Sequence, residues 1–334
     1  MALLLEKAKA QKGKTSPNPV TAAAVVQNGV VIAYGVHQGH GQPHAEVMAL
    51  SAAGEAAKGS TVFVNLEPCT HYGRTPPCVK ALIAAEVSEV VYAVDDPNPK
   101  VNMAPAGKIL ENAGIKVRSG LLKEEARRLN AVFFKNMQQN LPYVTLKAGI
   151  SLDGKIALSN GVSKYITGPE SQKQVHLIRR EHDAILVGAG TVLADDPSLD
   201  VRFGLLESGF RNPTKIILDP QCLITPRFSA IVVRPDMVPL ENGHFNWRLL
   251  LEKLYQQGIC SILIEGGSKV FTSALEQHAV DFAHFFIAPK ILGGKDDISV
   301  FSGKSKLTLA EVSQLLNPKF KVLGEDVWVS GEIL

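Results

Sequence analysis

The 334-residue sequence contains only four cysteines, Cys69, Cys78, Cys222 and Cys260. Four cysteines are too few to stabilise a chain of this length through disulfides, so we expect a reducing, cytoplasmic setting. Any special cysteine chemistry should then be metal binding or catalysis. Cys222 and Cys260 stand outside any spacing pattern, and we predict that both serve packing.

The sequence also lacks long apolar runs and a strong net charge. No run approaches the roughly 18 residues that a membrane span needs. Residues 1–5 are apolar, but charged residues follow at once, which predicts a helix rather than a signal peptide. The 35 basic and 32 acidic residues give a net charge of +3. This balance provides no electrostatic reason to expect a nucleic acid or an anionic membrane as a partner.

The length suggests about two domains. Strand and helix patterns alternate along the chain, which predicts buried sheets with helices packed on them. In the first half we predict a hairpin around Asn28-Gly29, strands over 61–66, 90–94 and 115–117, and helices over 45–57, 77–86, 105–113 and 123–137.

A polar segment that ends in Pro142 predicts the domain boundary. We therefore place a first domain at 1–139 and a second at 142–334. In the second domain we predict helices over 170–182 and 268–278, and strands over 143–148, 184–187, 215–218, 261–264, 282–288, 319–323 and 327–329.

The strongest chemical signal joins His44 and Glu46 with Cys69 and Cys78. Zinc prefers about four soft or borderline ligands, and a catalytic site keeps one position for water. One histidine and two cysteines supply the other three. Glu46 should reach that water without binding the metal, as in the zinc base deaminases, where a glutamate carries protons. Cys78 follows two prolines and should begin a helix, whose dipole favours a thiolate.

The spacing of the two cysteines is unusual. The generic deaminase signature places two residues between its cysteines, whereas eight separate Cys69 from Cys78. The segment 67–78, Glu-Pro-Cys-Thr-His-Tyr-Gly-Arg-Thr-Pro-Pro-Cys, resembles the RibD family of riboflavin-biosynthesis proteins, which join a pyrimidine deaminase to a reductase. The resemblance extends over nearly the whole chain, through segments 17–19, 41–46, 96–99, 151–155, 166–168, 190–197 and 265–267, with Lys147 and Arg202.

The resemblance implies an α/β protein with an N-terminal cytidine-deaminase-like α/β/α domain and a C-terminal dihydrofolate-reductase-like α/β domain. The first domain would use zinc hydroxide to hydrolyse the amino group of 2,5-diamino-6-ribosylamino-4(3H)-pyrimidinone 5′-phosphate, while Glu46 carries the proton to the leaving amine. The second domain would use NADPH to reduce the ribosyl group to ribityl. The implied partner is this small phosphoribosyl pyrimidine, and the implied assembly is a homo-oligomer.

The resemblance also implies site residues. In the first domain the matching substrate positions are Asn18, His37, Arg74, Asp96 and Asn98. Amide, imidazole and guanidinium groups suit a polar pyrimidine and a phosphate. Asn18, Asp96 and Asn98 could equally be turn or cap residues.

In the second domain, Glu265-Gly266-Gly267-Ser268 lies between a predicted strand and helix. Its free N–H groups could hold a phosphate, or the glycines could simply form a tight turn. By resemblance, the NADPH positions are Gly149, Tyr165, Thr191, Asp195, Gly267, Ser268, Lys269 and Val270. The reductase substrate positions are Lys147, Ser163, Arg179, Leu199, Arg202 and Glu265. Two arginines suit a phosphate dianion, although both could be surface charges and Lys147 could form a salt bridge.

The sequence departs from the family pattern mainly in the first domain. Residues 21–24 read Thr-Ala-Ala-Ala where the family usually has Val-Gly-Ala-Val, and alanine and proline stand at 104–106 in a loop that usually holds two glycines. One alternative is therefore a reductase with an impaired or structural zinc domain. A second alternative, a zinc domain that binds or edits RNA, is disfavoured by the weak net charge.

Overall fold

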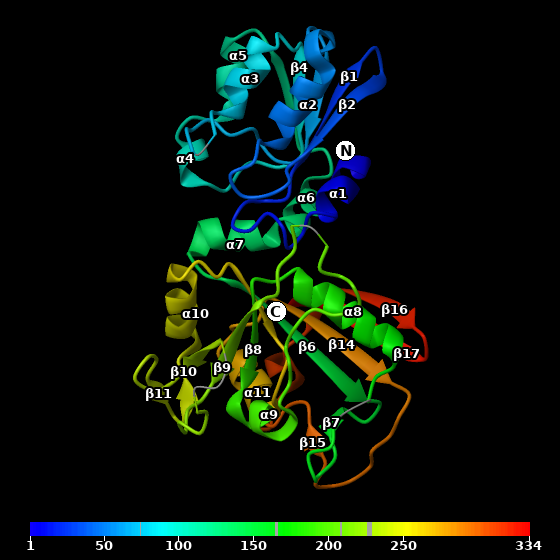
Figure 1. The fold of residues 1–334 in the computed structure, drawn as a ribbon, viewed down its shortest axis with the longest axis vertical. Helices are drawn as coiled ribbons and strands as arrows, with labels where there is room; N and C mark the ends of the chain where they lie inside the picture. Colours follow the sequence, from blue (N-terminus) through cyan, green and yellow to red (C-terminus); the bar gives the residue numbers. More distant parts are fainter. Residues whose placement is uncertain (74, 164–165, 208, 226–228) are drawn as a thin grey trace. The chain divides into compact units, whose positions relative to one another are not determined.

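A computed structural model describes residues 1–73, 75–163, 166–207, 209–225 and 229–334. The chain divides into two compact units, Met1–Asn140 and Leu141–Leu334 (Figure 1). The division falls in the polar segment before Pro142, where Asn140 adopts a left-handed conformation at the end of helix α7 (Ala131–Gln139). None of the helices in the described part of the chain is long and apolar enough to cross a membrane.

The first unit is built on a five-stranded sheet in the order β2-β1-β3-β4-β5. Asn28 and Gly29 form the tip of the predicted hairpin, with φ of 50° and 78°, which asparagine and glycine adopt readily. Strands β3, β4 and β5 are parallel, so their carboxyl ends share one edge. The strands are β1 (Ala22–Gln27), β2 (Val30–Val36), β3 (Thr61–Val64), β4 (Glu89–Tyr92) and β5 (Lys116–Ser119).

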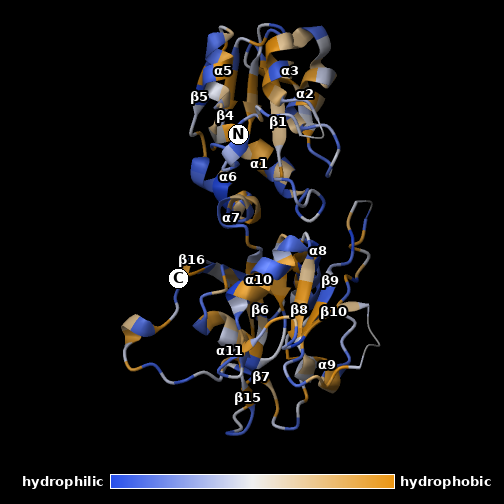
Figure 2. Cartoon of the chain, turned by 90° about the vertical axis from the view of Figure 1, so that its left-hand side faces the viewer, coloured by the Kyte–Doolittle hydropathy of each residue, from blue (hydrophilic) through white to orange (hydrophobic). Residues whose placement is uncertain are grey.

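Helices cover both faces of this sheet because its inner strands are apolar on both sides. Ala23 and Val25 share a core with α2 (Ala45–Ala53), α3 (Cys78–Ala84) and α5 (Ala106–Asn112). The alternate residues Ala22 and Ala24 share a core with α1 (Ala2–Lys9), and helices α6 (Lys123–Leu129) and α7 pack with the residues that follow β3 and β4. Figure 2 shows α6 as mainly hydrophilic, as expected of a helix with one buried side. The α/β/α arrangement is the one predicted.

Two local differences from the predictions concern the first unit. The helix predicted over 123–137 is two helices, because the buried side chain of Asn130 hydrogen-bonds both the N–H and the C=O of Val20. Residues after Asn98 form a short helix, α4 (Pro99–Asn102), before α5 begins. None of the described residues 21–24 and 100–106 has a positive φ, so the backbone there does not require the glycines of the family pattern.

The second unit contains an eight-stranded sheet in the order β10-β9-β8-β13-β6-β14-β17-β16. The first six strands in this order are parallel, and β17 and β16 are antiparallel additions at one edge. The strands are β6 (Tyr143–Ser151), β8 (Ala184–Gly188), β9 (Thr214–Leu218), β10 (Ala230–Val233), β13 (Ser261–Ile264), β14 (Phe282–Ala288), β16 (Leu315–Leu323) and β17 (Asp326–Ile333).

This sheet is also covered on both faces. Helices α10 (Trp247–Gln256) and α11 (Ser268–Glu276) pack on one face in the larger core. Helices α8 (Pro169–Arg180) and α9 (Ala189–Asp195) pack on the other face. Strand β8 is almost wholly hydrophobic (Figure 2), as a strand buried on both faces must be.

The sequence analysis did not predict α9, α10, β10 or the short pairs formed by β11 (Leu240–Glu241) with β12 (His244–Phe245) and by β7 (Lys155–Ala157) with β15 (Ile298–Ser299). The predicted packing role of Cys260 is confirmed, since it is buried, but that of Cys222 is wrong. The carboxylate of Asp219 accepts the N–H groups of Leu223 and Ile224, and the turn that results holds Cys222 exposed with a φ of 55°.

Candidate active sites

The first unit brings His44, Cys69 and Cys78 together. Their ligand atoms all lie within 4.8 Å of one another. His44 Nδ1 is 3.2 Å from Cys78 Sγ and 3.4 Å from Cys69 Sγ. Hydrogen bonds with Cys78 and His44 lower the pKa of Cys69, which favours the thiolate that a metal requires. An imidazole nitrogen and two sulfurs at this separation fit the donor set of a zinc site with one open position.

Local structure explains this convergence. His44 stands at the N-cap of α2, Cys78 is the first residue of α3, and Cys69 follows the carboxyl end of β3. The N–H of Cys78 donates to Cys69 Sγ at 3.3 Å. Two helix N-termini therefore face the same cluster, and their dipoles favour negative charge on the sulfurs.

Glu46 lies in the first turn of α2 and is 4% exposed. Burial, and then the charge of the Cys69 sulfur, raises the pKa of Glu46 to about 7. A carboxyl group with a pKa near neutrality can both accept and return a proton. A divalent cation at the cluster would oppose the rise in pKa that the sulfur charge causes, and it would favour the carboxylate form of Glu46.

A second group beside the cluster joins Asn18 to two histidines. His37 Nδ1 is 3.0 Å from the carbonyl oxygen of Pro43, which can only accept, so Nδ1 carries the proton. Asn18 Nδ2 then donates to His37 Nε2 at 3.0 Å. This bond turns Asn18 Oδ1 toward His40, at 3.3 Å from its Nδ1. The amide is thus held with a defined donor and acceptor direction.

Asp96 and Asn98 follow the carboxyl end of β4 and are tied to Glu67. The Glu67 carboxylate accepts the N–H groups of both Asp96 and Ala106, and so holds the two ends of the segment between them. The Asp96 carboxylate accepts the N–H of Asn98. Burial raises the pKa of Asp96 to about 7, although this hydrogen bond acts to lower it. The Asn98 side chain caps α4 through Lys100 N. The sequence analysis missed Glu67, although it lies two residues before Cys69.

The second unit contains a cavity of about 980 Å³ at the carboxyl ends of its parallel strands. Open α/β sheets commonly bind ligands at this edge. Most residues predicted for the reductase site line it, namely Lys147, Gly149, Ser163, Thr191, Asp195, Glu265, Gly267, Ser268, Lys269 and Val270. Ser163 Oγ donates to the Asp195 carboxylate at 3.1 Å. Asp219, Gln221, His244 and Trp247 also line it, and the sequence analysis missed them because the β9 end and the β11–β12 hairpin fold back from distant segments.

The turn between β13 and α11 favours its glycines. A Cβ on Gly266 would stand 3.0 Å from Thr191 Oγ1, a tight contact, and Gly267 has a φ of 84°, a conformation that favours glycine. Ser268 Oγ is buried at the start of α11 without a hydrogen-bond partner among the described residues. A phosphate oxygen would satisfy it and the helix N-terminus together.

Arg179 and Glu265 form a buried ion pair beside this turn. Arg179 Nε and Nη2 donate to the two carboxylate oxygens at 2.6 and 2.7 Å, and Nη1 donates to the Asp200 carbonyl at 2.8 Å. Burial by itself raises the pKa of Glu265, but the charge and the hydrogen bonds of Arg179 and the charge of Lys147 together outweigh burial and lower the pKa below its ordinary value. Burial lowers the pKa of Lys147, although the negative charge of Glu265 acts to raise it. The Arg179 guanidinium is therefore already hydrogen-bonded within the protein. The forked, charge-assisted pair that the sequence suggested it could form with a phosphate is formed with the Glu265 carboxylate.

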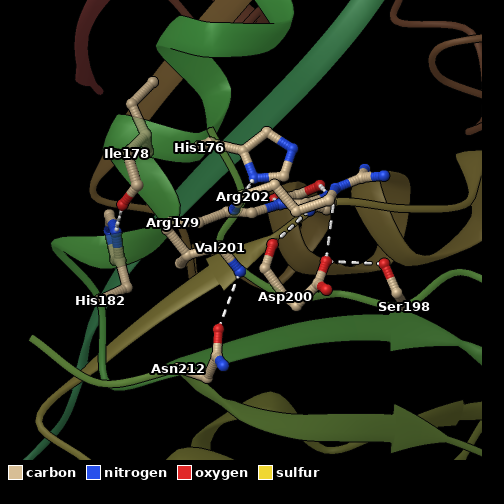
Figure 3. Close-up of polar contacts among 10 residues, drawn as sticks. His176, Ile178, Arg179, His182, Ser198, Asp200, Val201, Arg202 and Asn212 are labelled. Carbon is tan, nitrogen blue, oxygen red and sulfur yellow. Dashed lines mark hydrogen bonds and ion pairs between the residues drawn. The ribbon is translucent and has the colours of Figure 1, made fainter. Parts of the chain in front are cut away.

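Arg202 lies beside this pair but is exposed. Figure 3 shows His176 and Arg179 of α8 directed toward segment 198–202. His176 Nδ1 accepts the N–H of Arg202 at 2.9 Å, and the Arg202 side chain, 62% exposed, is 3.5 Å from Asp200. Burial, and then the charges of Arg179 and Arg202, lowers the pKa of His176 to about 4. A neutral imidazole therefore holds Arg202 in place.

Three predicted residues need separate mention. Leu199 is 5% exposed and packs with α8 and α9, so only its main chain, with a φ of 48°, is available to a ligand. Arg74 and Tyr165 lie outside the described residues.

Family models match a part of each of the two units. The model for the cytidine and deoxycytidylate deaminase zinc-binding region matches residues 1–94, and the model for the RibD C-terminal domain matches residues 142–328. The chain belongs to the RibD family. Among curated RibD proteins, that of Aquifex aeolicus is 42% identical over 349 aligned positions, covering 98% of this chain and 96% of the relative. The Escherichia coli protein is 38% identical, with the same coverage.

Solved RibD structures agree. Acinetobacter baumannii RibD, form 1, superposes with a TM-score of 0.88 at 34% identity, covering 100% of this chain and 97% of that one. The Thermotoga maritima diaminohydroxyphosphoribosylaminopyrimidine deaminase/5-amino-6-(5-phosphoribosylamino)uracil reductase gives the same values. As a RibD, the chain is a riboflavin-biosynthesis enzyme that joins a zinc-binding deaminase to a reductase of the NADPH-using type. The predicted family, fold class, paired activities and cofactors are confirmed.

Proposed function

We propose that His44, Cys69 and Cys78 hold the zinc of the deaminase unit and that Glu46 moves the proton. The substrate proposed is the one implied by the resemblance, 2,5-diamino-6-ribosylamino-4(3H)-pyrimidinone 5′-phosphate. A zinc ion at these ligands would supply the Lewis acidity that makes water a nucleophile near neutral pH. The observation that carries the proposal is the convergence of one imidazole nitrogen and two sulfurs beside a buried carboxyl group.

In this proposal, Glu46 accepts a proton from water and delivers it to the amino group, which leaves as ammonia while a carbonyl forms on the ring. Asn18 and His37, fixed by their hydrogen bonds, would orient the pyrimidine, together with Arg74, Asp96 and Asn98. The Asn18 amide offers a donor and an acceptor, which suits the edge of a diaminopyrimidinone.

For the second unit, we propose that the cavity takes NADPH and the phosphoribosyl product of the first step. NADPH supplies the hydride that reduces the ribosyl group to ribityl. Gly267, Ser268, Lys269 and Val270 would bind its phosphates at the α11 N-terminus, and Gly149, Tyr165, Thr191 and Asp195 would line the rest of its site.

Within the same cavity, Lys147, Ser163 and Glu265 would contact the sugar phosphate, and the Leu199 main chain would contact it from segment 198–202. Arg202 would bind the phosphate through its exposed guanidinium, and Arg179 would orient Glu265. We also propose that the chain works in a reducing, cytoplasmic setting, as a homo-oligomer, on a small molecule rather than on nucleic acid. The four cysteines, none in a disulfide, agree with that setting.

The alternative of an impaired deaminase unit is tested by ammonia release. We expect the zinc-loaded chain to release ammonia from the diaminopyrimidinone substrate without NADPH. Glu46→Gln removes the proton carrier and should lower this rate by about 10²-fold or more. NADPH oxidation with the deaminated compound should stay unchanged in the same variant. A parent chain that releases no ammonia but oxidises NADPH would contradict the proposal and favour the alternative.

A further inference from the structure

The eight residues between Cys69 and Cys78 have no role in the function proposed above, apart from Arg74. We call these eight residues the insertion. Thr75 belongs to it, and Thr75 Oγ1 is 3.2 Å from His44 Nε2. The opposite ring nitrogen, Nδ1, is the one that faces the two cysteine sulfurs. The insertion therefore returns to the far side of the histidine that begins α2.

The chemistry of the ring fixes the direction of this bond. An imidazole that ligates a metal through Nδ1 carries its remaining proton on Nε2. Nε2–H is then the donor and Thr75 Oγ1 the acceptor. An acceptor at this position favours one tautomer and one rotation of the ring, and it makes the ligating nitrogen more basic.

Local structure holds Thr75 in place. Its carbonyl oxygen accepts the N–H of Gly73 at 3.2 Å. Pro76 and Pro77 follow, and their rings restrict φ, so the chain passes directly from Thr75 to Cys78 at the start of α3. One rigid segment thus carries both a metal ligand and the hydroxyl that orients another.

We propose that Thr75 is a positioning residue that holds the His44 ring in the orientation and tautomer required to bind zinc through Nδ1. This proposal rests on the zinc site proposed above. It gives the longer cysteine spacing a physical purpose, since the additional residues bring a hydroxyl back to the histidine ring.

The test is zinc affinity, measured on the full chain by competition with a chromogenic chelator. Thr75→Val keeps the shape of the side chain and removes the acceptor, and it should weaken zinc binding about 10- to 100-fold. Thr75→Ser restores the hydroxyl and should bind zinc as the parent does. Thr75→Ala should behave like Thr75→Val, which keeps the test valid if one of the two variants folds poorly.

Thr70→Val is a matched control. It makes the same chemical change in the same insertion, at a hydroxyl with no hydrogen-bond partner among the described residues, and it should leave zinc affinity unchanged. Equal zinc affinity in the parent and Thr75→Val would overturn the role of Thr75, as would an equal loss in Thr70→Val or no rescue by Thr75→Ser. A parent chain that binds no zinc would instead contradict the zinc site itself.

Discussion

His176 illustrates how one buried side chain can hold the main chain of a residue proposed to bind phosphate. Its Nδ1 lone pair accepts the Arg202 N–H, and its ring packs edge-on against Phe203 with centroids 5.0 Å apart. The charged groups around it are Arg179, Arg202, Asp200 and Glu265. Protonation would remove the acceptor and add a third positive charge beside the two arginines.

We therefore expect the second unit to lose stability as the pH falls from about 6.5 to about 4. The folded-state pKa of His176, about 4, lies below its ordinary value of 6.5, so its contribution is complete above pH 6.5 and is lost as the pH falls toward 4. In His176→Asn, the amide oxygen keeps an acceptor near Nδ1 but does not titrate. Urea unfolding at pH 7.5 and 5, followed by tryptophan fluorescence, should show a larger loss in the parent than in the variant.

Both tryptophans, Trp247 and Trp328, belong to the second unit, so the fluorescence signal reports on this unit alone. Equal losses in the parent and His176→Asn would show that His176 does not titrate in this range in the way inferred.

At the scale of elements, the position of α2 depends on its close packing against β2. A Cβ on Gly35 would collide with the carbonyl oxygen of Ala45 and the N–H of Ala49. Both collisions are with backbone, which cannot rotate away. Because His44 is at the N-cap position of α2 and Glu46 lies in its first turn, the packing at Gly35 sets where both side chains lie.

Gly35→Ala should push α2 away from the sheet, destabilise the first unit by about 1–3 kcal/mol and lower ammonia release. NADPH oxidation should stay at the parent rate. Circular dichroism during thermal unfolding and the two activity assays would measure these effects.

Gly107→Ala is the matched control for this substitution. It adds a Cβ in α5 whose nearest neighbour, Val117, is 3.8 Å away, an ordinary contact, so it should be neutral or slightly stabilising. If Gly35→Ala behaved like Gly107→Ala, the close packing of α2 on β2 would not be what positions the deaminase residues.

At the scale of the whole chain, each activity lies inside one compact unit with its own sheet and core. The residues proposed to bind zinc all lie in the first unit, and the described residues that line the cavity proposed to bind NADPH all belong to the second. The two activities should therefore respond separately to removal of the metal.

Treatment of the full chain with a strong zinc chelator should abolish ammonia release and leave NADPH oxidation unchanged. Added zinc should restore the deaminase, since the proposed ligands lie at the N-termini of α2 and α3 and in the segment that follows β3. A parallel loss of both activities would mean that the second unit depends on the metal of the first.

The sequence by itself determined much of this protein. The residues proposed as metal ligands, the nearby Glu46, the Asn28-Gly29 hairpin and the glycine turn before α11 could be singled out because each depends on residue types at short, fixed spacings. Many strands were predictable because they are apolar on both faces.

Only the tertiary structure decided contacts between distant segments. It pairs Arg179 with Glu265, which are 86 positions apart. The sequence alone had suggested that this guanidinium could bind a phosphate. It breaks a predicted helix at Asn130, whose side chain bonds Val20 from 110 positions away. It also brings Thr75 to His44. A side chain's hydrogen-bond partner depends on how sheets and helices pack, and no local pattern contains that information.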